Sequence, residues 1–141
     1  MVRVMASGVF DIIHPGHIFY LKKARELGDE LFVVIASDKT VERRKRKPIM
    51  RQEERAIVVG ALKPVDSVVI GKDTGDIFET AREIKPDVVA LGFDQAFDES
   101  ELEREAKKRG LDMRVVRMPK MNGDSDATRK IIARILEVFE K

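Results

Sequence analysis

The sequence predicts a doubly wound α/β fold, in which helices cover both faces of a parallel sheet. Short apolar runs alternate along the chain with segments of helical periodicity, a pattern typical of strands that are buried on both faces. The chain has 141 residues, enough for a sizeable core, and no linker or low-complexity stretch divides it. We therefore expect one domain over residues 1–141, with strands joined by right-handed crossovers.

The apolar runs predict the strands, and helical spacing of apolar side chains predicts the helices. The expected strands are Val2–Ala6, Glu30–Ser37, Ser67–Ile70, Val88–Leu91 and Met113–Met118. The expected helices are Pro15 to near Gly28, Arg51–Leu62, Asp76–Ile84, Glu99–Arg109 and Asp126–Phe139. Because the Glu99–Arg109 helix is highly charged, we expect it to be exposed. The segment Asp38–Met50 is polar and basic, and we expect a loop there.

Apolar side chains at helical spacing give these helices an apolar face, as a helix that packs on a core has. In the Arg51–Leu62 helix this face comprises Ile57, Val58, Ala61 and Leu62. In the last helix it comprises Ile131, Ile132, Ile135, Leu136 and Phe139.

The composition narrows the possible classes of function. Charged residues make up 37% of the chain but nearly balance, at a net charge of +2, which argues against a general nucleic-acid binder. The chain has no cysteine, so a disulfide framework and a cysteine nucleophile are both excluded, as fits a reducing cytoplasm. We find neither a signal peptide nor an apolar run near the roughly 18 residues of a membrane span. We therefore expect a soluble cytoplasmic protein with no membrane partner.

Both histidines of the chain lie between Ser7 and His17, where the first strand passes into the first helix. Pro15 is favoured in a first helical turn. A helix N-terminus presents unpaired N–H groups and a partial positive charge, and Gly16 lets an anion approach the backbone between the imidazoles. This arrangement suits a triphosphate. The alternative is a metal ion held by His14 and His17. It is disfavoured because the chain has neither cysteine nor an HExxH pattern, and we predict no metal ligands.

The same turn contains a longer pattern, Gly-x-Phe-Asp-x-x-His-x-Gly-His, over Gly8–His17. This pattern resembles the HxGH motif of the cytidylyltransferase-like nucleotidyltransferases, and the resemblance covers nearly the whole chain. It implies a Rossmann-like sheet of five parallel strands in the order 3-2-1-4-5. In such sheets ligands bind beyond the C-terminal strand ends where the strand order reverses, here between the first and fourth strands. The residues after those strands, Gly8–His17 and Gly92–Gln95, are the expected site loops.

The densest charge run is Val41–Arg51. Such a run is usually a solvated face, but this one follows the second strand and therefore lies at the same rim as the histidines. The resemblance implies that a basic loop contacts the phosphates here, with Arg44, Arg46 and Lys47 as candidates. Arginine makes bidentate phosphate contacts that lysine does not. The rival interpretation, a nucleic-acid patch, lacks interleaved aromatic side chains that stack on bases.

The turn into the last helix, Gly123–Lys130, is the third candidate element. Cytidylyltransferases have a motif of the type Arg-Thr-Glu-Gly-Ile-Ser-Thr there, whose serine and threonine contact phosphates. This chain departs from that motif, since Ala127 takes the place of the serine while Thr128 keeps the threonine. The alternative is a plain helix cap by Ser125 or Asp126. Two basic residues stand near the expected arginine, namely Arg117 and Lys120.

The resemblance also implies a mechanism and a set of site residues. An acceptor phosphate attacks the α-phosphorus of a nucleoside triphosphate in line, and pyrophosphate leaves with Mg²⁺ bound. The expected catalytic residues are His14, His17 and Arg46. The expected nucleotide-binding residues are Gly8, Val9, Phe10, Asp11, His14, His17, Arg44, Lys47, Gly92, Asp94 and Thr128. Asp11 and Asp94 are expected to face each other across the crevice, where Asp11 orients the site or the metal and Asp94 contacts the acceptor or the ribose. The alternative for both is hydrogen bonding within their loops.

Three further sequence segments narrow the choice of substrate. Arg46–Ile49, Leu62–Asp66 and Leu91–Gln95 look most like the small archaeal FAD synthases, which transfer AMP from ATP to FMN. Two family features are absent, because Val9 stands where threonine is usual and the chain lacks the C-terminal cysteines that can occur there. The first alternative is a glycerol-3-phosphate cytidylyltransferase, which uses CTP and a polyol phosphate, although Lys63 stands where that enzyme has arginine. A pantetheine-phosphate adenylyltransferase or a sugar-phosphate nucleotidyltransferase comes third.

A different class also stays open, namely a non-catalytic nucleotide sensor or a basic-loop RNA binder, because fold does not determine function. For the enzyme we expect small-molecule substrates and no nucleic-acid partner. Relatives in the family are commonly homodimers, which implies a homodimer here, with Phe93 and Phe97 as candidate interface residues.

Overall fold

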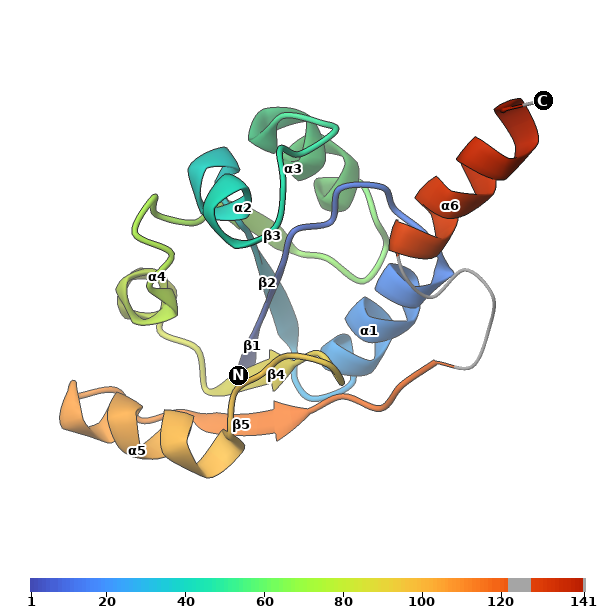
Figure 1. The fold of residues 1–141 in the computed structure, drawn as a ribbon. Coiled ribbons are helices and arrows are strands. Elements are labelled where there is room, and N and C mark those ends of the chain that lie inside the picture. Colours follow the sequence, from blue (N-terminus) through green and yellow to red (C-terminus); the bar gives the residue numbers. More distant parts are fainter. Residues whose placement is uncertain (122–127, 141) are drawn as a thin grey trace.

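Strands and helices alternate along residues 1–121 and 128–140, the part of the chain that the computed structural model describes (Figure 1). The strands are β1 (Arg3–Gly8), β2 (Glu30–Ile35), β3 (Ser67–Ile70), β4 (Val88–Leu91) and β5 (Arg114–Arg117). The helices are α1 (Pro15–Arg25), α2 (Asp38–Arg44), α3 (Gln52–Gly60), α4 (Ile77–Ile84), α5 (Glu99–Lys108) and α6 (Thr128–Phe139). All of the predicted strands are present at the expected places.

The strands form one parallel sheet in the order β3-β2-β1-β4-β5, so the predicted fold class and strand order are confirmed. The chain moves outward from β1 through β2 to β3 and then returns past β1 to β4. Pairing of β1 with β2 continues to Gly8 and Ile35, whereas pairing of β1 with β4 ends at Ala6 and Ala90. Strands β1 and β4 therefore separate at their C-terminal ends, where a doubly wound sheet binds its ligands.

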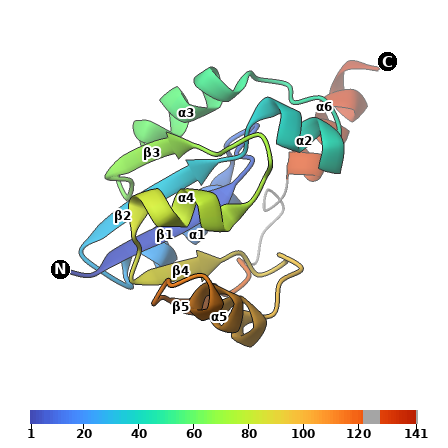
Figure 2. The same cartoon turned by 90° about the vertical axis from the view of Figure 1, so that its left-hand side faces the viewer.

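Successive residues of the strands supply two separate cores, because side chains alternate between the two faces of a sheet. Val4 and Ala6 of β1 pack on one face with buried residues of α1 and α3. Met5, between them, packs on the other face with buried residues of α4 and α5. Figures 1 and 2 show these two helix layers on opposite sides of the sheet. Leu102 and Ala106 of α5 are buried, so the expectation of an exposed helix holds for its charged side alone.

The expectation of a loop over Asp38–Met50 is wrong in its first half, which forms α2. The Ser37 side chain caps this helix by accepting a hydrogen bond from the Thr40 N–H at 3.3 Å. Thr40 and Val41 are buried, and their burial holds the helix in place despite the charges that follow.

The predicted apolar face of the Arg51–Leu62 helix is also wrong except at Leu62, which packs against the core. Ile57 is 73% exposed, while Arg55 and Val59 are fully buried. The buried face is displaced because the Arg55 guanidinium finds hydrogen-bond partners inside the protein, as described below, and a charged group with partners can be buried.

The apolar stripe of α6 does not pack on the sheet. Ile135, Leu136 and Val138 are 45–49% exposed and Phe139 is 80% exposed. Figure 1 shows α6 extending away from the rest of the molecule. Its amphipathic pattern therefore is not explained by the core of one chain. No helix within the described residues is long and apolar enough to cross a membrane.

Candidate functional site

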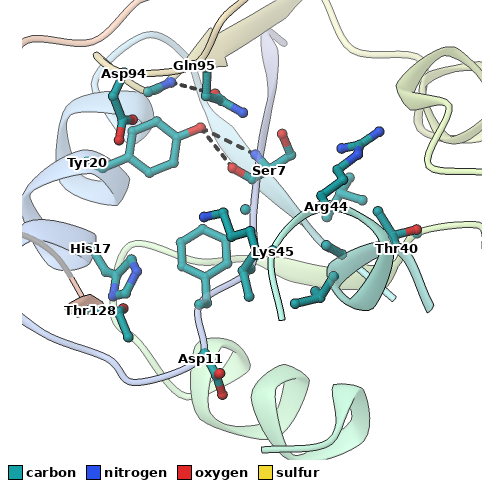
Figure 3. Close-up of a pocket in the computed structure, with 18 of the residues that line it drawn as sticks. Ser7, Asp11, His17, Tyr20, Thr40, Arg44, Lys45, Asp94, Gln95 and Thr128 are labelled. Carbon is teal, nitrogen blue, oxygen red and sulfur yellow. Dashed lines mark hydrogen bonds between the residues drawn. The ribbon is translucent and has the colours of Figure 1, made fainter. Parts of the chain in front are cut away.

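A cavity of about 1110 Å³ lies at the C-terminal edge of the sheet (Figure 3). Its walls come from the turn after β1, the end of α2, the residues after β3, the loop after β4 and the start of α6. The predicted site residues that line it are Gly8, Val9, Phe10, Asp11, His14, His17, Arg44, Arg46, Gly92, Asp94 and Thr128. Segments far apart in the sequence are thus brought to one place by the strand order.

The hydroxyl of Tyr20 bridges β1 and β4 where these strands separate. It donates a hydrogen bond to the Ala90 carbonyl at 2.6 Å and accepts one from the Ser7 N–H at 3.3 Å. Both backbone groups lie at the point where the strand ladder ends, so the hydroxyl replaces a missing rung. Burial raises the pKa of the Tyr20 hydroxyl above its ordinary value, which keeps the group protonated. Sequence patterns did not indicate this role.

The two histidines are fixed by the turn that begins α1. The His14 Nδ1 accepts a hydrogen bond from the Gly16 N–H at 3.1 Å, and the His17 Nδ1 accepts one from the His14 N–H at 3.3 Å. The rings stack with their centroids 3.8 Å apart. Because Nδ1 is an acceptor in both rings, each neutral imidazole carries its hydrogen on Nε2.

The surroundings keep His17 neutral at physiological pH. Burial is the largest cause, and the electrostatic interactions of His17 with His14 and Lys45 add to it, lowering the pKa of His17 to about 3. A neutral imidazole with its hydrogen on Nε2 is a hydrogen-bond donor. The first turn of α1 contains no acidic residue, so the partial positive charge of the helix end is not offset locally. The turn can therefore receive an anion.

The backbone before the histidines is tightly packed. Phe10 has a φ of 51°, in the left-handed region that residues other than glycine seldom adopt. Its ring is buried, and the ring centroid lies 5.2 Å from that of His17. A Cβ at Gly8 would lie 2.8 Å from the Phe10 ring. A side chain at that position would therefore displace the buried Phe10 ring.

Asp11 ties the basic segment to the histidine turn. Its carboxylate accepts hydrogen bonds from the Ile49 and Met50 N–H groups at 2.8 and 2.9 Å and from Arg46 Nη1 at 2.9 Å. Burial alone raises the pKa of the Asp11 carboxyl, but these hydrogen bonds outweigh it and hold the pKa below its ordinary value. Figure 3 shows Asp11 directed away from Asp94, so the two carboxylates do not face each other as expected.

Arg55 reinforces the same junction, and the sequence interpretation missed it. Its Nε donates to the Met50 carbonyl at 3.0 Å, its Nη1 to the Val9 carbonyl at 2.8 Å, and its Nη2 to Asp38 Oδ1 at 2.7 Å. The one signal in the sequence is an arginine four residues before Val59, on the face that the helix buries.

The basic segment presents a different lysine to the cavity from the one expected. Lys45 lines the cavity, and Figure 3 shows its amine among the labelled side chains between Ser7 and His17. Lys47 is exposed and does not line the cavity. Arg44 lines it too, but donates to the Gly75 carbonyl at 3.1 Å.

Thr128, the first residue of α6, lies beside the histidine turn (Figure 3). Its hydroxyl is 3.5 Å from the Ile12 carbonyl oxygen, to which it donates. Three residues of the predicted turn lie outside the described residues. These are Ser125 and Asp126, the candidate helix caps, and Ala127. The Lys120 Nζ lies 5.7 Å from the centroid of the Phe93 ring, in the loop after β4.

A doubly wound sheet with a phosphate-binding type of helix turn in its crevice defines an α/β nucleotide-binding protein. The comparison with protein families agrees, because the cytidylyltransferase-like family model matches residues 5–134. The chain belongs to this family. The predicted family and the predicted class of enzyme, a nucleotidyltransferase, are thereby confirmed.

Similar proteins come from archaea. A protein named FAD synthase from Aciduliprofundum boonei is 56% identical over 140 residues, which is 97% of this chain and 92% of that protein. One of the same name from Archaeoglobus profundus is 55% identical over 99% of this chain and 90% of its own length. The crystal structure of a protein described as a lipopolysaccharide core biosynthesis protein, from Thermoplasma volcanium, superposes with a TM-score of 0.84. It is 46% identical and covers 86% of this chain and 99% of its own.

Proposed function

We propose that this protein is an FMN adenylyltransferase, which makes FAD and pyrophosphate from ATP and FMN. The observation that carries the reaction type is the stacked pair of His14 and His17 at the N-terminus of α1, inside the crevice. Similarity at 56% and 55% identity to proteins named FAD synthase supports FMN as the acceptor.

In the proposed reaction, a phosphate oxygen of FMN forms a bond to the α-phosphorus of ATP. The bond from that phosphorus to the bridging oxygen breaks, and pyrophosphate leaves with the electron pair. This chemistry requires positioning and stabilisation of charge rather than a covalent intermediate on the protein. His14 and His17 donate their Nε2–H groups to phosphate oxygens as charge develops. Each donor lowers the barrier by about 3 kcal/mol, by analogy with oxyanion-hole donors.

Positive side chains after α2 complete the proposed site. Lys45 adds a charge inside the cavity, and Arg46 is held beside it by Asp11, with its side chain 39% exposed and able to reach a phosphate. In this account Asp11 orients Arg46 and the backbone of residues 49–50, rather than contacting the nucleotide itself.

We propose that Mg²⁺ enters with ATP as part of the substrate. Among residues 1–121 and 128–140 no group of three or more histidine, aspartate or glutamate side chains is placed to hold a metal ion. The cationic side chains of the cavity suit phosphate oxygens, which in turn suit Mg²⁺ as ligands.

Pyrophosphate release tests the proposal. The purified protein is incubated with Mg²⁺ and each pair of one nucleotide, ATP or CTP, and one acceptor, FMN, glycerol 3-phosphate or phosphopantetheine. We expect release with ATP and FMN alone. Release with CTP and glycerol 3-phosphate would instead identify a cytidylyltransferase, and no release in any combination would favour a non-catalytic nucleotide sensor.

We also propose a homodimer in which the exposed apolar side of α6 is covered by a second chain. Leu136 and Phe139 on this helix are 49% and 80% exposed, and Phe93 and Phe97 at the cavity rim are 41% and 43% exposed. Light scattering should give twice the monomer mass. Leu136→Glu should halve that mass. The matched control is Ile57→Glu, the same kind of change on the exposed face of α3, which should leave the mass unchanged. A monomeric wild type at micromolar concentration would contradict the proposal. A cytoplasmic location stays a prediction.

A further inference from the structure

The loop between β4 and α5, residues 92–98, forms one wall of the cavity but has little internal support. Phe93 and Phe97 are 41% and 43% exposed, so apolar burial contributes little to its order. Inside the loop, the Gly92 N–H donates to the Gln95 side-chain oxygen at 2.6 Å, and the Gln95 N–H donates to the Gly92 carbonyl at 3.3 Å. The shape of the loop therefore depends on contacts from outside it.

Arg117, the last residue of β5, supplies those contacts. Its Nη1 lies within hydrogen-bond distance of three carbonyl oxygens, those of Gly92 at 3.1 Å, Phe93 at 3.3 Å and Gln95 at 2.8 Å. A single side chain from the neighbouring strand thus gathers the backbone of the first half of the loop.

The same guanidinium also holds the second half. Its Nη2 donates to the Phe97 carbonyl. Glu99, the first residue of α5, accepts from Nη2 at 2.6 Å and from Nε at 2.9 Å through its Oε1. The carboxylate therefore orients the guanidinium, and the guanidinium orients the loop. A lysine cannot replace it, because an ammonium is a single compact charge whereas the guanidinium spreads its donors over a planar fork.

Arg117 is absent from the cavity wall, whereas Gly92, Asp94 and Gln95 of the loop line it. Figure 3 shows the Asp94 carboxylate beside Tyr20, at the end of the site away from Asp11. A carboxylate in such a crevice is suited to accept hydrogen bonds from the hydroxyl groups of a nucleotide ribose.

We infer that Arg117 is a positioning residue for nucleotide binding, which sets the shape of the 92–98 loop and thereby the place of Asp94. The inference rests on the proposed function. Since the reacting phosphates lie at His14 and His17, on another wall, Arg117 acts on the affinity for ATP and leaves the chemical step unchanged.

Steady-state kinetics of two variants test this. Arg117→Gln should raise KM for ATP about tenfold, as expected for the loss of roughly one charge-assisted hydrogen bond to the ligand. kcat and KM for FMN should stay within about twofold of the wild type. Arg117→Lys should not restore KM, because the charge alone is insufficient. Arg114→Gln, an exposed arginine at the start of the same strand, is the matched control and should behave as wild type.

A double-mutant cycle identifies the route of the effect. If Arg117 acts through Asp94, then Arg117→Gln should add little to the rise in KM that Asp94→Asn causes by itself. Fully additive effects, or an unchanged KM for ATP in Arg117→Gln, would overturn the inference. So would an equal loss of kcat and of affinity for both substrates. If Arg117→Gln does not fold, Glu99→Ala removes the acceptor that orients the guanidinium while leaving the loop carbonyls in place, and should raise KM for ATP severalfold.

Calorimetric titration with ATP alone separates the two hypotheses. Weaker ATP binding by Arg117→Gln than by wild type supports the positioning role even if FMN proves not to be the acceptor. Equal ATP affinity in both proteins, together with normal FAD formation, rejects the positioning role and leaves the proposed function intact.

Discussion

Replacing Tyr20 by phenylalanine tests how the crevice is built, because it removes a single oxygen atom from the junction of β1 and β4. The ring stays, so its packing against Phe10 is kept. The Ala90 carbonyl loses a donor at 2.6 Å, and the Ser7 N–H loses an acceptor at 3.3 Å. A buried polar group without a partner costs about 1–3 kcal/mol.

We expect Tyr20→Phe to lower the free energy of unfolding by about 2 kcal/mol, because the longer Ser7 contact contributes less than the short Ala90 contact. For a chain of 141 residues this corresponds to a fall in Tm of about 6 °C. Urea denaturation followed by circular dichroism measures the change. Amide exchange of Ser7 should also become faster, which locates the effect at the strand junction.

The control for this variant is Ser100→Ala, which removes an exposed hydroxyl from α5 and should change stability by less than about 0.5 kcal/mol. A Tyr20→Phe protein as stable as the control, with unchanged exchange at Ser7, would refute the view that this hydroxyl replaces a rung of the strand ladder.

Two further predictions concern titratable groups of the site. The pKa of His17 is about 3 in the folded protein and about 6.5 when unfolded, so between these pH values the unfolded chain binds a proton that the folded chain does not. Stability should therefore fall as the pH is lowered through this window, by up to about 1.4 kcal/mol per pH unit from this group. His17→Gln should flatten that slope in urea titrations, and an identical slope in both proteins would contradict the buried neutral imidazole. Asp11→Asn should cost about 2 kcal/mol of stability and raise KM for ATP, because an amide cannot accept from all three donors of the 46–50 segment. Asp112→Asn, at an exposed position, should leave both quantities unchanged.

The topology was predictable because five apolar runs separated by helical segments leave few right-handed arrangements. The presence of α2 and the buried face of α3 were harder to predict from the sequence. The segment after β2 was expected to be a loop on the strength of its charges, yet the Ser37 cap and buried Val41 form α2. Burial of Arg55 in place of Ile57 depends on carbonyl partners from distant segments, which no local pattern in α3 specifies.

Some residues of the site could be predicted from the sequence and others could not. The histidine turn was predictable because its geometry is local, with each imidazole bonded to backbone within three residues. The choice of Lys45 over Lys47 as the lysine of the cavity follows from where α2 ends, which its charged sequence does not specify. Tyr20 donates to the Ala90 carbonyl of β4, and Arg117 donates to the Gly92 carbonyl after β4. Both contacts join residues more than twenty positions apart, so the residues around Tyr20 and Arg117 carry no sign of them.

Direct detection of FAD tests the central claim, namely that the histidine pair catalyses adenylyl transfer from ATP to FMN. Chromatography of a reaction containing Mg²⁺, ATP and FMN should show FAD in equal amount to the pyrophosphate released. His17→Ala should remain folded by circular dichroism and form FAD about 10²–10³-fold more slowly, as expected for removal of one donor to the developing charge. Pyrophosphate without FAD, or FAD formed by His17→Ala at the wild-type rate, would contradict the account.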